Sequence, residues 1–439
     1  MTDSRPVIAR RILALAAPTT VLAALQVAAL LIETVIAARQ GRAALAGWAV
    51  VLPFALLLGQ MSAGAMGGGV VSAIARALGA GRPDEAAELA MHAIGIACGF
   101  AAGFVVLLAV FPHTVLGWIG GPEAAAAGAA YSAWLFGVGA LPTWLANTFA
   151  SILRGAGRHA LAARVLNLSW LGYPPLAFVL AEWAGFGLAG LGMAFAACFW
   201  AGAVAMGVVV FSGAAGFTPS LRVRWRWSLF RRILAVGAVA CALAAVSNLT
   251  TILVTARLAG FGPAAVAAYG VSARLEFMMI PLAFGVGSAL TALVGRAVGQ
   301  GDWTLARRTA WVGGGMAFGF CFLIGAVVAL FPSFFAAFFA SDAEVLAIAA
   351  LALSIIGPAF GGFGLGMAMY FAAMGAGQMA WPVAAGLSRL GIAVGGGWLL
   401  MDVMGLGLAG QFLAVAAGIT AYGVLTAVAV RPGVWSARG

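Results

Sequence analysis

Residues 12–38 read ILALAAPTTVLAALQVAALLIETVIAA, and the fold class follows from the character of this run. Glu33 is its one charged residue. A helix of this length, rising about 1.5 Å per residue, exceeds the roughly 30 Å thickness of the hydrocarbon core of a bilayer. Arg5, Arg10 and Arg11 precede it as they would precede the apolar core of a secretory signal, but the run is too long and shows no convincing cleavage site. The sequence therefore predicts a first membrane-spanning helix.

The whole chain resembles this stretch in composition. Of its 439 residues, 64% are hydrophobic and 8% are charged, and the mean hydropathy is +1.09. This composition excludes a soluble multidomain protein, because it cannot cover a water-facing surface. Backbone groups in lipid must be hydrogen-bonded within their own helix, so we predict an all-α, polytopic membrane protein. Twelve stretches are long and charge-poor enough to span the membrane, at about 12–38, 43–75, 90–112, 126–153, 162–181, 187–213, 233–257, 264–295, 309–332, 345–373, 381–401 and 407–430.

The positive charges indicate how these spans are oriented. All 23 basic residues counted as Lys or Arg are Arg, against 12 acidic residues, and the net charge is +11. With the N-terminus in the cytoplasm, 18 arginines fall in cytoplasmic segments, whereas Arg39, Arg42 and Arg257 fall outside and Arg274 and Arg389 lie at membrane depth. This asymmetry predicts cytoplasmic N- and C-termini. Because the arginines are spread through loops, no nucleic-acid partner is indicated.

Three short patterns recur in the second half of the chain at one fixed offset. The matching pairs are RALGAG at 76–81 with RAVGQG at 296–301, GAG at 155–157 with GAG at 375–377, and GLAG at 187–190 with GLAG at 407–410. Six spans per repeat is an even number, so both halves cross the membrane in the same direction. We predict two parallel six-helix lobes, residues 1–218 and 219–439, related by a pseudo-twofold axis along the membrane normal.

The same patterns exclude several kinds of chemistry. The glycine patches lie where helices end, without the preceding strand of a phosphate-binding loop, and a chain without lysine has no Walker lysine. Direct ATP hydrolysis is therefore excluded, and we predict a secondary active transporter, not an enzyme. The four cysteines and three histidines form no ligand cluster, so no metal site and no cofactor are predicted.

Glu33 is the strongest candidate for a coupling group. Acidic side chains within a membrane are costly, and burial disfavours the charged carboxylate, so such a group can exchange a proton. The alternative is a structural carboxyl, satisfied by hydrogen bonds or paired with Arg39. Gln26 lies seven residues earlier, two helical turns away, and so shares a helix face with Glu33.

The eighth and eleventh spans carry the other deep charges. Arg274 and Glu276 are two residues apart, so on a helix they do not face each other and we expect them to have different partners. Glu276 is the second predicted coupling carboxylate. Arg389 needs a counter-charge or a wet cavity, and a charge pair within the second lobe and a substrate contact both explain it.

Polar uncharged side chains within the spans are further candidates for the cavity. Asn147 and Asn167 are intramembrane amides, for which hydrogen bonds between helices are the common role. Tyr173 precedes Pro174 and Pro175, which interrupt helical hydrogen bonding in the fifth span and free backbone carbonyls for flexing or for cation coordination.

Three stretches of the chain carry patterns typical of one transporter family. They are Leu15-Ala-Ala-Pro18 with Gln26 and Glu33-Thr34 in the first span, residues 59–82 in the second, and residues 269–287 in the eighth. These patterns resemble the first-helix pattern, the second-span signature and a bacterial eighth-span signature of the multidrug and toxic compound extrusion (MATE) family, within the multidrug/oligosaccharidyl-lipid/polysaccharide exporter superfamily. Together with twelve spans and the repeat, this resemblance covers essentially the whole chain.

The resemblance implies a cation-coupled antiporter that exports amphipathic, often cationic small molecules across the bacterial inner membrane. It implies that Glu33 and Glu276 couple to the cation, that Thr34 supports Glu33, and that Asn167 lies in the region that supplies amide partners. Glu stands at position 33 where the family commonly has Asp, and Tyr173-Pro174 occupies a stretch where many members have an acidic residue. With fewer hard oxygen ligands for Na⁺, we favour H⁺ as the coupling ion.

Other functions remain open at the level of sequence. A lipid-linked oligosaccharide flippase of the same superfamily would carry a polyanion, for which only Arg274 and Arg389 lie deep enough. A major-facilitator carrier shares the 6+6 duplication, but residues 76–82 lack the acidic residue of its loop motif. A non-transporting receptor or scaffold would not need intramembrane carboxylates. No obligatory protein partner is indicated, and we expect a monomer in the lipid bilayer.

Overall fold

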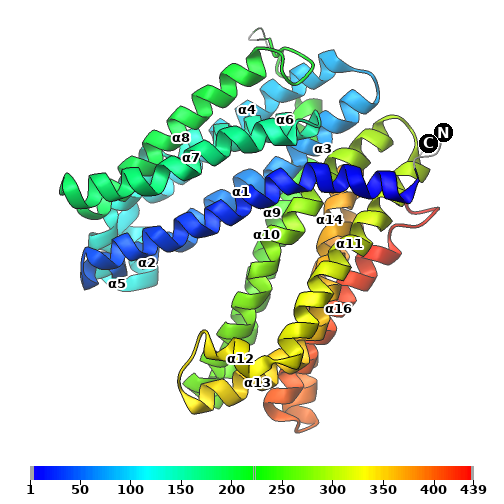
Figure 1. Cartoon of the computed structure of the whole chain (residues 1–439). Coiled ribbons are helices and arrows are strands. Elements are labelled where there is room, and N and C mark those ends of the chain that lie inside the picture. The colour runs from blue at the N-terminus through cyan, green and yellow to red at the C-terminus, as the bar shows by residue number, and fades with distance from the viewer. Residues whose placement is uncertain (1–3, 221, 223, 437–439) are drawn as a thin grey trace. The chain divides into compact units, whose positions relative to one another are not determined.

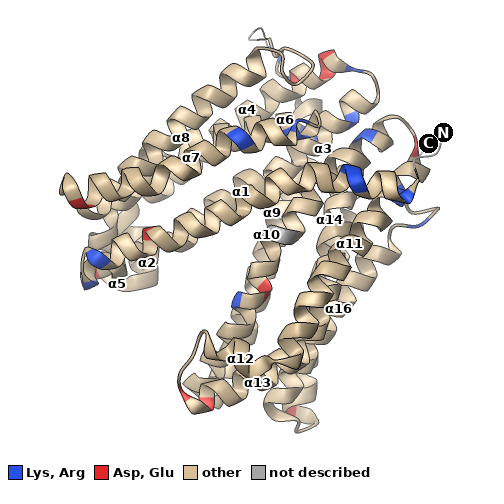
Figure 2. Cartoon of the chain, in the orientation of Figure 1, with Lys and Arg blue, Asp and Glu red and all other residues tan. Residues whose placement is uncertain are grey.

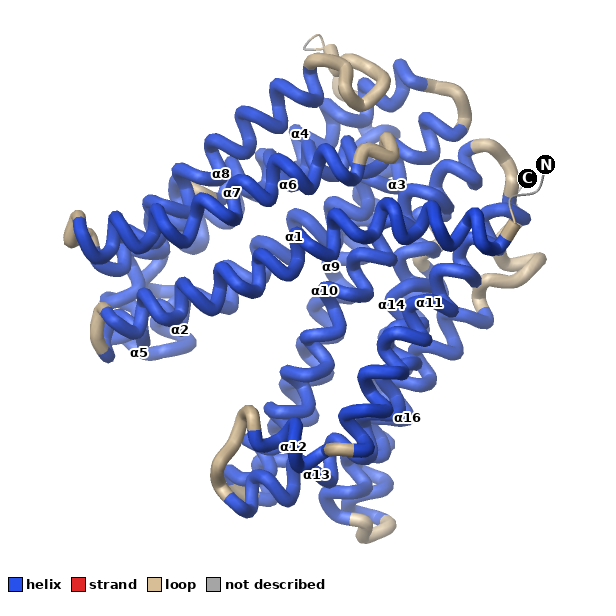
Figure 3. Tube along the Cα trace, viewed as in Figure 1, coloured by secondary structure: helices blue, strands red, loops and turns tan. Residues whose placement is uncertain are grey.

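The computed structural model describes residues 4–220, 222 and 224–436. Within these ranges the chain is built of helices and short connections and has no strand (Figure 3). The predicted all-α class is confirmed. Each of the twelve predicted spans falls on a helical segment.

By internal contacts the chain forms two compact units. We call residues 17–238 the N-terminal unit, and residues 1–16 with 239–439 the C-terminal unit. The division falls within helices α1 (Arg5–Arg39) and α9 (Trp227–Leu258), and α9 is the helix that follows the boundary predicted at 218. Ile8 and Ile12 of α1 are buried in a cluster with residues of the C-terminal unit, which explains why the start of α1 belongs to that unit.

The N-terminal unit contains most of α1 and eleven further helical segments (Figure 1). Of these, α7 and α8 lie side by side, and α2 packs on α5. The segments are α2 (Arg42–Gly59), η1 (Gln60–Ala65), α3 (Met66–Gly79), α4 (Pro83–Val105), η2 (Val106–Val110), α5 (Pro112–Ser132), η3 (Ala133–Val138), α6 (Ala140–Gly155), α7 (His159–Phe178), η4 (Val179–Trp183) and α8 (Gly187–Phe211), followed by the start of α9.

The C-terminal unit repeats this plan from α9 onward. Its central helix is α14, which packs on α10, α11 and α16. The segments are η5 (Ala259–Phe261), α10 (Pro263–Gly299), α11 (Trp303–Leu330), α12 (Pro332–Ala337), α13 (Ala343–Ile356), η6 (Gly357–Ala359), α14 (Phe360–Ala376), α15 (Ala380–Gly391), η7 (Ile392–Gly396), η8 (Leu399–Val403) and α16 (Gly407–Val428).

Most helices are long and apolar enough to cross a bilayer. Among the described residues ten single helices qualify, and an eleventh is the pair Pro112–Val138 and Ala140–Gly155, which bends by 44°. The remaining predicted span, 162–181, is helical from His159 to Trp183 as α7 and η4. It is less apolar because it carries the charged Arg164 as well as Asn167 and Tyr173, and the last two are candidate site residues.

The repeated glycines lie at equivalent close contacts in the two units. A Cβ added at Gly155 would lie 2.9 Å from Cβ of Ile74, which brings α6 against α3. A Cβ added at Gly375, the equivalent glycine of the second repeat, would lie 2.6 Å from the backbone oxygen of Thr291, which brings α14 against α10. Both distances are too short for any side chain, so close helix packing explains these glycines without a phosphate site.

The two units also carry equivalent ion pairs at helix ends. Arg39 Nε lies 3.1 Å from Glu182 Oε1 in the N-terminal unit, and Gln40 donates to the same oxygen at 3.0 Å. In the C-terminal unit Arg257 pairs with Asp402, which stands at the position of the repeat equivalent to Glu182. Figure 2 shows the same tendency along the chain, since charged residues gather at helix ends and leave most helix centres uncharged.

Candidate functional site

Glu33 lies on α1 and is only 8% exposed. Its carboxylate accepts two hydrogen bonds from the N-terminal unit. Trp48 Nε1, on α2, donates to Oε1 at 2.8 Å, and the Tyr131 hydroxyl, on α5, donates to the same oxygen. Arg39 pairs with Glu182, so it is not the counter-charge of Glu33. The buried carboxylate is therefore held by neutral hydrogen-bond donors.

A contact between α2 and α5 positions both donors. A Cβ added at Gly47 would lie 2.5 Å from the backbone nitrogen of Gly128, so only glycine permits this approach. Trp48 directly follows the first glycine, and Tyr131 lies one helical turn after the second. The close approach of the two helices therefore brings an indole N–H and a phenol O–H to one oxygen of Glu33.

The second carboxylate oxygen of Glu33 is differently placed. Among the described residues, Oε2 has no hydrogen-bond partner, because both donors converge on Oε1. The buried Tyr173 hydroxyl on α7 lies beside this carboxylate as a third neutral donor, although its geometry falls short of a hydrogen bond. A proton can therefore be added at Oε2 without breaking either existing hydrogen bond.

The structure separates the other predicted residues of this region. Gln26 is half-buried and has no hydrogen bond to Glu33, and the Thr34 hydroxyl donates to its own helix at Leu30 O, 2.7 Å away. Asn147 Nδ2 donates to Ser62 Oγ at 2.9 Å, a hydrogen bond between two helical segments. Asn167 is half-buried, and its Oδ1 has no partner among the described residues. Asn167 and Tyr173 thus leave two unsatisfied buried oxygens on α7.

Glu276 in the C-terminal unit has a cationic partner. Its carboxylate on α10 pairs with the Arg389 guanidinium on α15, and the two side chains are 13% and 11% exposed. The same guanidinium lies 5.6 Å from the ring centre of Phe363, within the range of a cation–π contact. Arg274, two residues before Glu276, is exposed, and no ion pair of Arg274 occurs among the described residues. The two neighbouring charges on α10 therefore have different surroundings.

Two residues of the Glu33 site were missed by sequence reasoning. Trp48 belongs to a run of apolar residues and gives no polar signal. Tyr131 offered a weak signal, because a tyrosine within a membrane span usually needs a partner for its hydroxyl. Neither the helix contact nor the pairing across 98 residues can be read from spacing along the chain.

Replacing Tyr131 by Phe tests whether this hydrogen bond holds the site together. We expect Tyr131→Phe to lower the free energy of unfolding in detergent by about 1.5–3 kcal/mol, the usual contribution of a hydrogen bond to a charged group. Tyr370→Phe is the matched control, since Tyr370 lies on α14 of the C-terminal unit and is not part of the Glu33 site. Equal losses in both variants would contradict the assigned role of Tyr131.

The comparisons with known proteins agree with this fold and repeat. The family model MatE matches residues 18–181 and again residues 238–399. The chain belongs to the MatE family. The starts of the two matches, at 18 and 238, are separated by the same offset as the repeated glycines at 155 and 375, and the predicted resemblance is confirmed. Members of this family are transporters, so the chain is a multi-pass membrane transporter of small molecules.

Two curated relatives of this MatE protein carry the description "probable multidrug resistance protein NorM". The protein from Xanthomonas campestris pv. campestris is 27% identical over 345 residues, covering 73% of this chain and 71% of the relative. The protein from Xanthomonas axonopodis pv. citri is 26% identical over 342 residues, with the same coverage. These relatives are bacterial and, by their descriptions, associated with multidrug resistance.

Solved transporter structures share the fold of this MatE chain. A MOP superfamily transporter from Pyrococcus furiosus aligns with a TM-score of 0.89 at 20% identity, covering 97% of this chain and 96% of the other. The Vibrio cholerae MATE transporter VcmN in its bent form aligns with a TM-score of 0.89 at 21% identity, covering 97% of both chains. At this identity the likeness establishes the fold alone.

Proposed function

We propose that this chain is a proton-coupled antiporter that exports amphipathic, cationic small molecules by alternating access, with Glu33 as the proton-binding group. One observation carries the proposal. The Glu33 carboxylate is buried among neutral donors, with Oε1 hydrogen-bonded twice and Oε2 open. A group in such a place changes its charge when it binds or releases a proton, and nearby helices respond to that change.

The donors around Glu33 favour H⁺ over Na⁺. Sodium, like other hard cations, is held by several oxygen ligands, whereas Trp48 presents an N–H that cannot coordinate a cation. Among the described residues no group of three or more Asp, Glu, His or Cys side chains is placed to hold a metal ion. A proton needs a single lone pair, which Glu33 Oε2 supplies.

Coupling then follows from mutual exclusion. The ionised Glu33 carboxylate favours a cationic substrate, and protonation removes that attraction together with the cost of a buried charge. The transporter has one state that binds the proton better and another that binds the substrate better. Binding of either ligand shifts the population toward the state that prefers it. If the bound proton weakens substrate binding by a given free energy, the bound substrate weakens proton binding by the same amount. Exchange of one for the other is the result.

Glu276 has a different role in this proposal. Because the Arg389 guanidinium already neutralises Glu276, a coupling cation would have to displace a tethered charge. We therefore assign the Glu276–Arg389 pair chiefly to linking α10 with α15, and place the exchanged proton on Glu33. Arg274 then remains as an exposed cation at membrane depth, which is too little for the polyanionic cargo of an oligosaccharide flippase.

The proposal includes a location and an assembly state. The asymmetry of the arginines supports cytoplasmic termini, and the Xanthomonas relatives support the inner membrane of a bacterium. We also propose a monomer in the lipid bilayer, with no obligatory protein partner.

Reconstitution into liposomes tests this function directly. Liposomes with an imposed pH gradient and an internal pH indicator should show proton movement when ethidium is added, and equally in the presence or absence of Na⁺. Proton movement that requires Na⁺ would transfer the coupling role to that ion. A substrate response without any proton movement would contradict proton coupling.

A further inference from the structure

The linker that joins α8 to α9 is fastened to α4 by polar contacts. It ends at Arg226, and the Arg226 guanidinium pairs with the Glu88 carboxylate on α4. Arg232, in the first turns of α9, pairs with Glu85 on the same helix. All four residues belong to the N-terminal unit. We call this set of interactions the α4–linker contact, and it holds the chain at the point where α9 begins.

His92 lies at the centre of the α4–linker contact and is fully buried. Its Nε2 accepts the backbone N–H of Arg226 at 3.0 Å, and its Nδ1 lies 2.7 Å from the backbone oxygen of Glu88. A backbone N–H can only donate, and a carbonyl oxygen can only accept. These partners assign the proton to Nδ1 and leave Nε2 without one, so the imidazole of this contact is neutral.

Two aromatic side chains fix the position of the imidazole. The ring centres of Trp225 and Phe230 lie 5.2 Å and 4.7 Å from that of His92, and the two rings stack on each other. A Cβ added at Gly95 would lie 3.1 Å from the Trp225 ring, so this glycine leaves room for the indole. The packed imidazole cannot easily turn toward other partners, and its two hydrogen bonds depend on its protonation state.

A proton added to His92 would break the hydrogen bond to the linker. The imidazolium has no lone pair with which to accept the N–H of Arg226. The carboxylates one and two turns earlier on α4, Glu88 and Glu85, already pair with arginines. The helices that pack closely on α4 and the start of α9 bring further positive charges: Arg76 on α3, Arg154 on α6, and Arg231 and Arg232 on α9. The new charge would therefore also meet repulsion.

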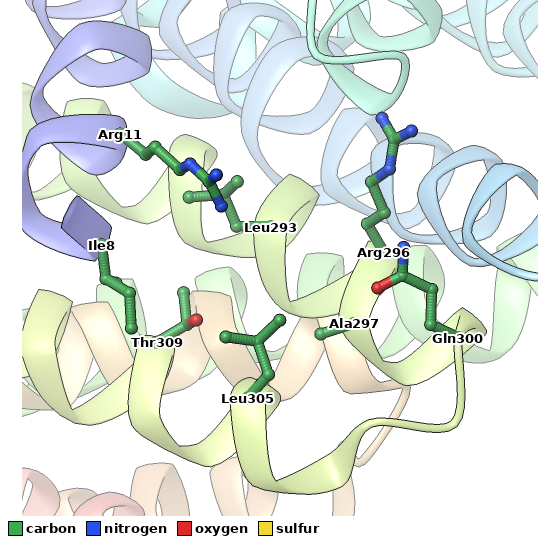
Figure 4. Close-up of a pocket in the computed structure, with 8 residues that line it drawn as sticks. All are labelled: Ile8, Arg11, Leu293, Arg296, Ala297, Gln300, Leu305 and Thr309. Atoms are coloured by element: carbon green, nitrogen blue, oxygen red, sulfur yellow. The ribbon is translucent and has the colours of Figure 1, made fainter. Parts of the chain in front are cut away.

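The second repeat lacks the α4–linker contact. At the offset of the repeat, three of its positions carry other residues: Leu305 for Glu85, Arg308 for Glu88 and Val312 for His92. Leu305 lines a pocket of about 150 Å³ instead, together with Arg296 and the start of α1 (Figure 4). Packing of the repeated helices therefore does not require these polar residues, which indicates a separate role for them beside the linker.

We propose that His92 makes the α4–linker contact sensitive to acid. The neutral imidazole holds Arg226, and with it the start of α9, against α4, whereas protonation releases the linker. The contact lies at the end of α4 that is predicted to be cytoplasmic, so acidification of the cytoplasm is the condition it would sense. Glu33 takes no part in it, and the inference stands independently of the proposed function.

Hydrogen exchange of the backbone amides measures this contact directly. The full chain in nanodiscs is exchanged at pH 8 and at pH 5, and the rates for residues 224–231 are corrected for the intrinsic effect of pH on exchange. We expect the protection of the wild-type protein in this segment to fall at least tenfold at pH 5. Protection that is unchanged between the two pH values would overturn the proposal.

Two substitutions of His92 separate the roles of its ring nitrogens. The side-chain oxygen of His92→Gln can take the place of Nε2 but does not titrate, so protection should change less than twofold between pH 8 and pH 5. His92→Asn reaches only the place of Nδ1, and its segment should exchange rapidly at both pH values. His159→Gln removes another buried histidine of the same unit and should behave as the wild-type protein does. An equal loss of protection in His92→Gln and the wild-type protein would assign the effect to the carboxylates of α4 and contradict the proposal.

Discussion

Glu33→Gln is expected to reduce substrate-driven proton movement in liposomes to the level of protein-free vesicles. Gln has nearly the shape of Glu, and its amide oxygen can still accept from Trp48 Nε1 and Tyr131 Oη, so the helix contacts should survive. What is lost is the titratable oxygen. The variant should therefore fold, bind cationic dye more weakly than the wild-type protein, and fail to exchange it for protons.

The control for this variant is another carboxylate of the same unit. Glu182→Gln removes a charge paired with Arg39, whose side chain is 59% exposed, so the pair contributes less than about 1 kcal/mol. Its proton movement should match that of the wild-type protein. Full proton coupling in Glu33→Gln, or its loss in both variants, would be inconsistent with Glu33 as the proton site.

Arg389→Gln is expected to give the largest loss of stability among single changes of charge. The Glu276 side chain is only 13% exposed, and the substitution leaves its carboxylate without a cation. Removing one partner of a buried ion pair costs about 3–5 kcal/mol. The double variant Glu276→Gln/Arg389→Gln removes both charges and should recover most of that loss. Thermal and denaturant unfolding in detergent, followed by the near-ultraviolet signal, measures both effects.

An exposed pair supplies the comparison for Arg389. Arg82 Nη1 lies 2.7 Å from Glu85 Oε2 at the start of α4, and the Arg82 side chain is 55% exposed. Arg82→Gln should therefore cost less than about 1 kcal/mol. If the Glu276/Arg389 double variant is as unstable as Arg389→Gln, the loss comes from packing around Phe363 and not from an uncompensated charge.

The architecture could be predicted from the sequence because membrane helices leave strong local signals. Apolar runs locate the spans. Glycines at matching positions, such as 155 and 375, indicated an internal repeat. The two matches to the family model, which begin at residues 18 and 238, confirm that repeat. Span 162–181 was predicted because the stretch is long and poor in charge, although the helix there is less apolar than the other spans.

The sites were only partly predictable, for a physical reason. A lone buried carboxylate such as Glu33 stands out in any apolar run, but its donors depend on how α2 meets α5 at Gly47 and Gly128. Glu276 and Arg389 were both singled out, yet their contact joins residues 113 apart and follows from helix packing. Spacing in the sequence shows which residues share a face of one helix, but it does not show which residues of a neighbouring helix they contact.

The most direct test of the central claim is the release of protons when substrate binds. Ethidium is added to the purified protein in weakly buffered detergent solution at about neutral pH, and the free proton concentration is followed with an indicator dye. The wild-type protein is expected to release protons in proportion to the dye bound, and Glu33→Gln, at dye concentrations high enough to offset its weaker binding, is expected to release none. Equal proton release from both proteins would contradict the role of Glu33.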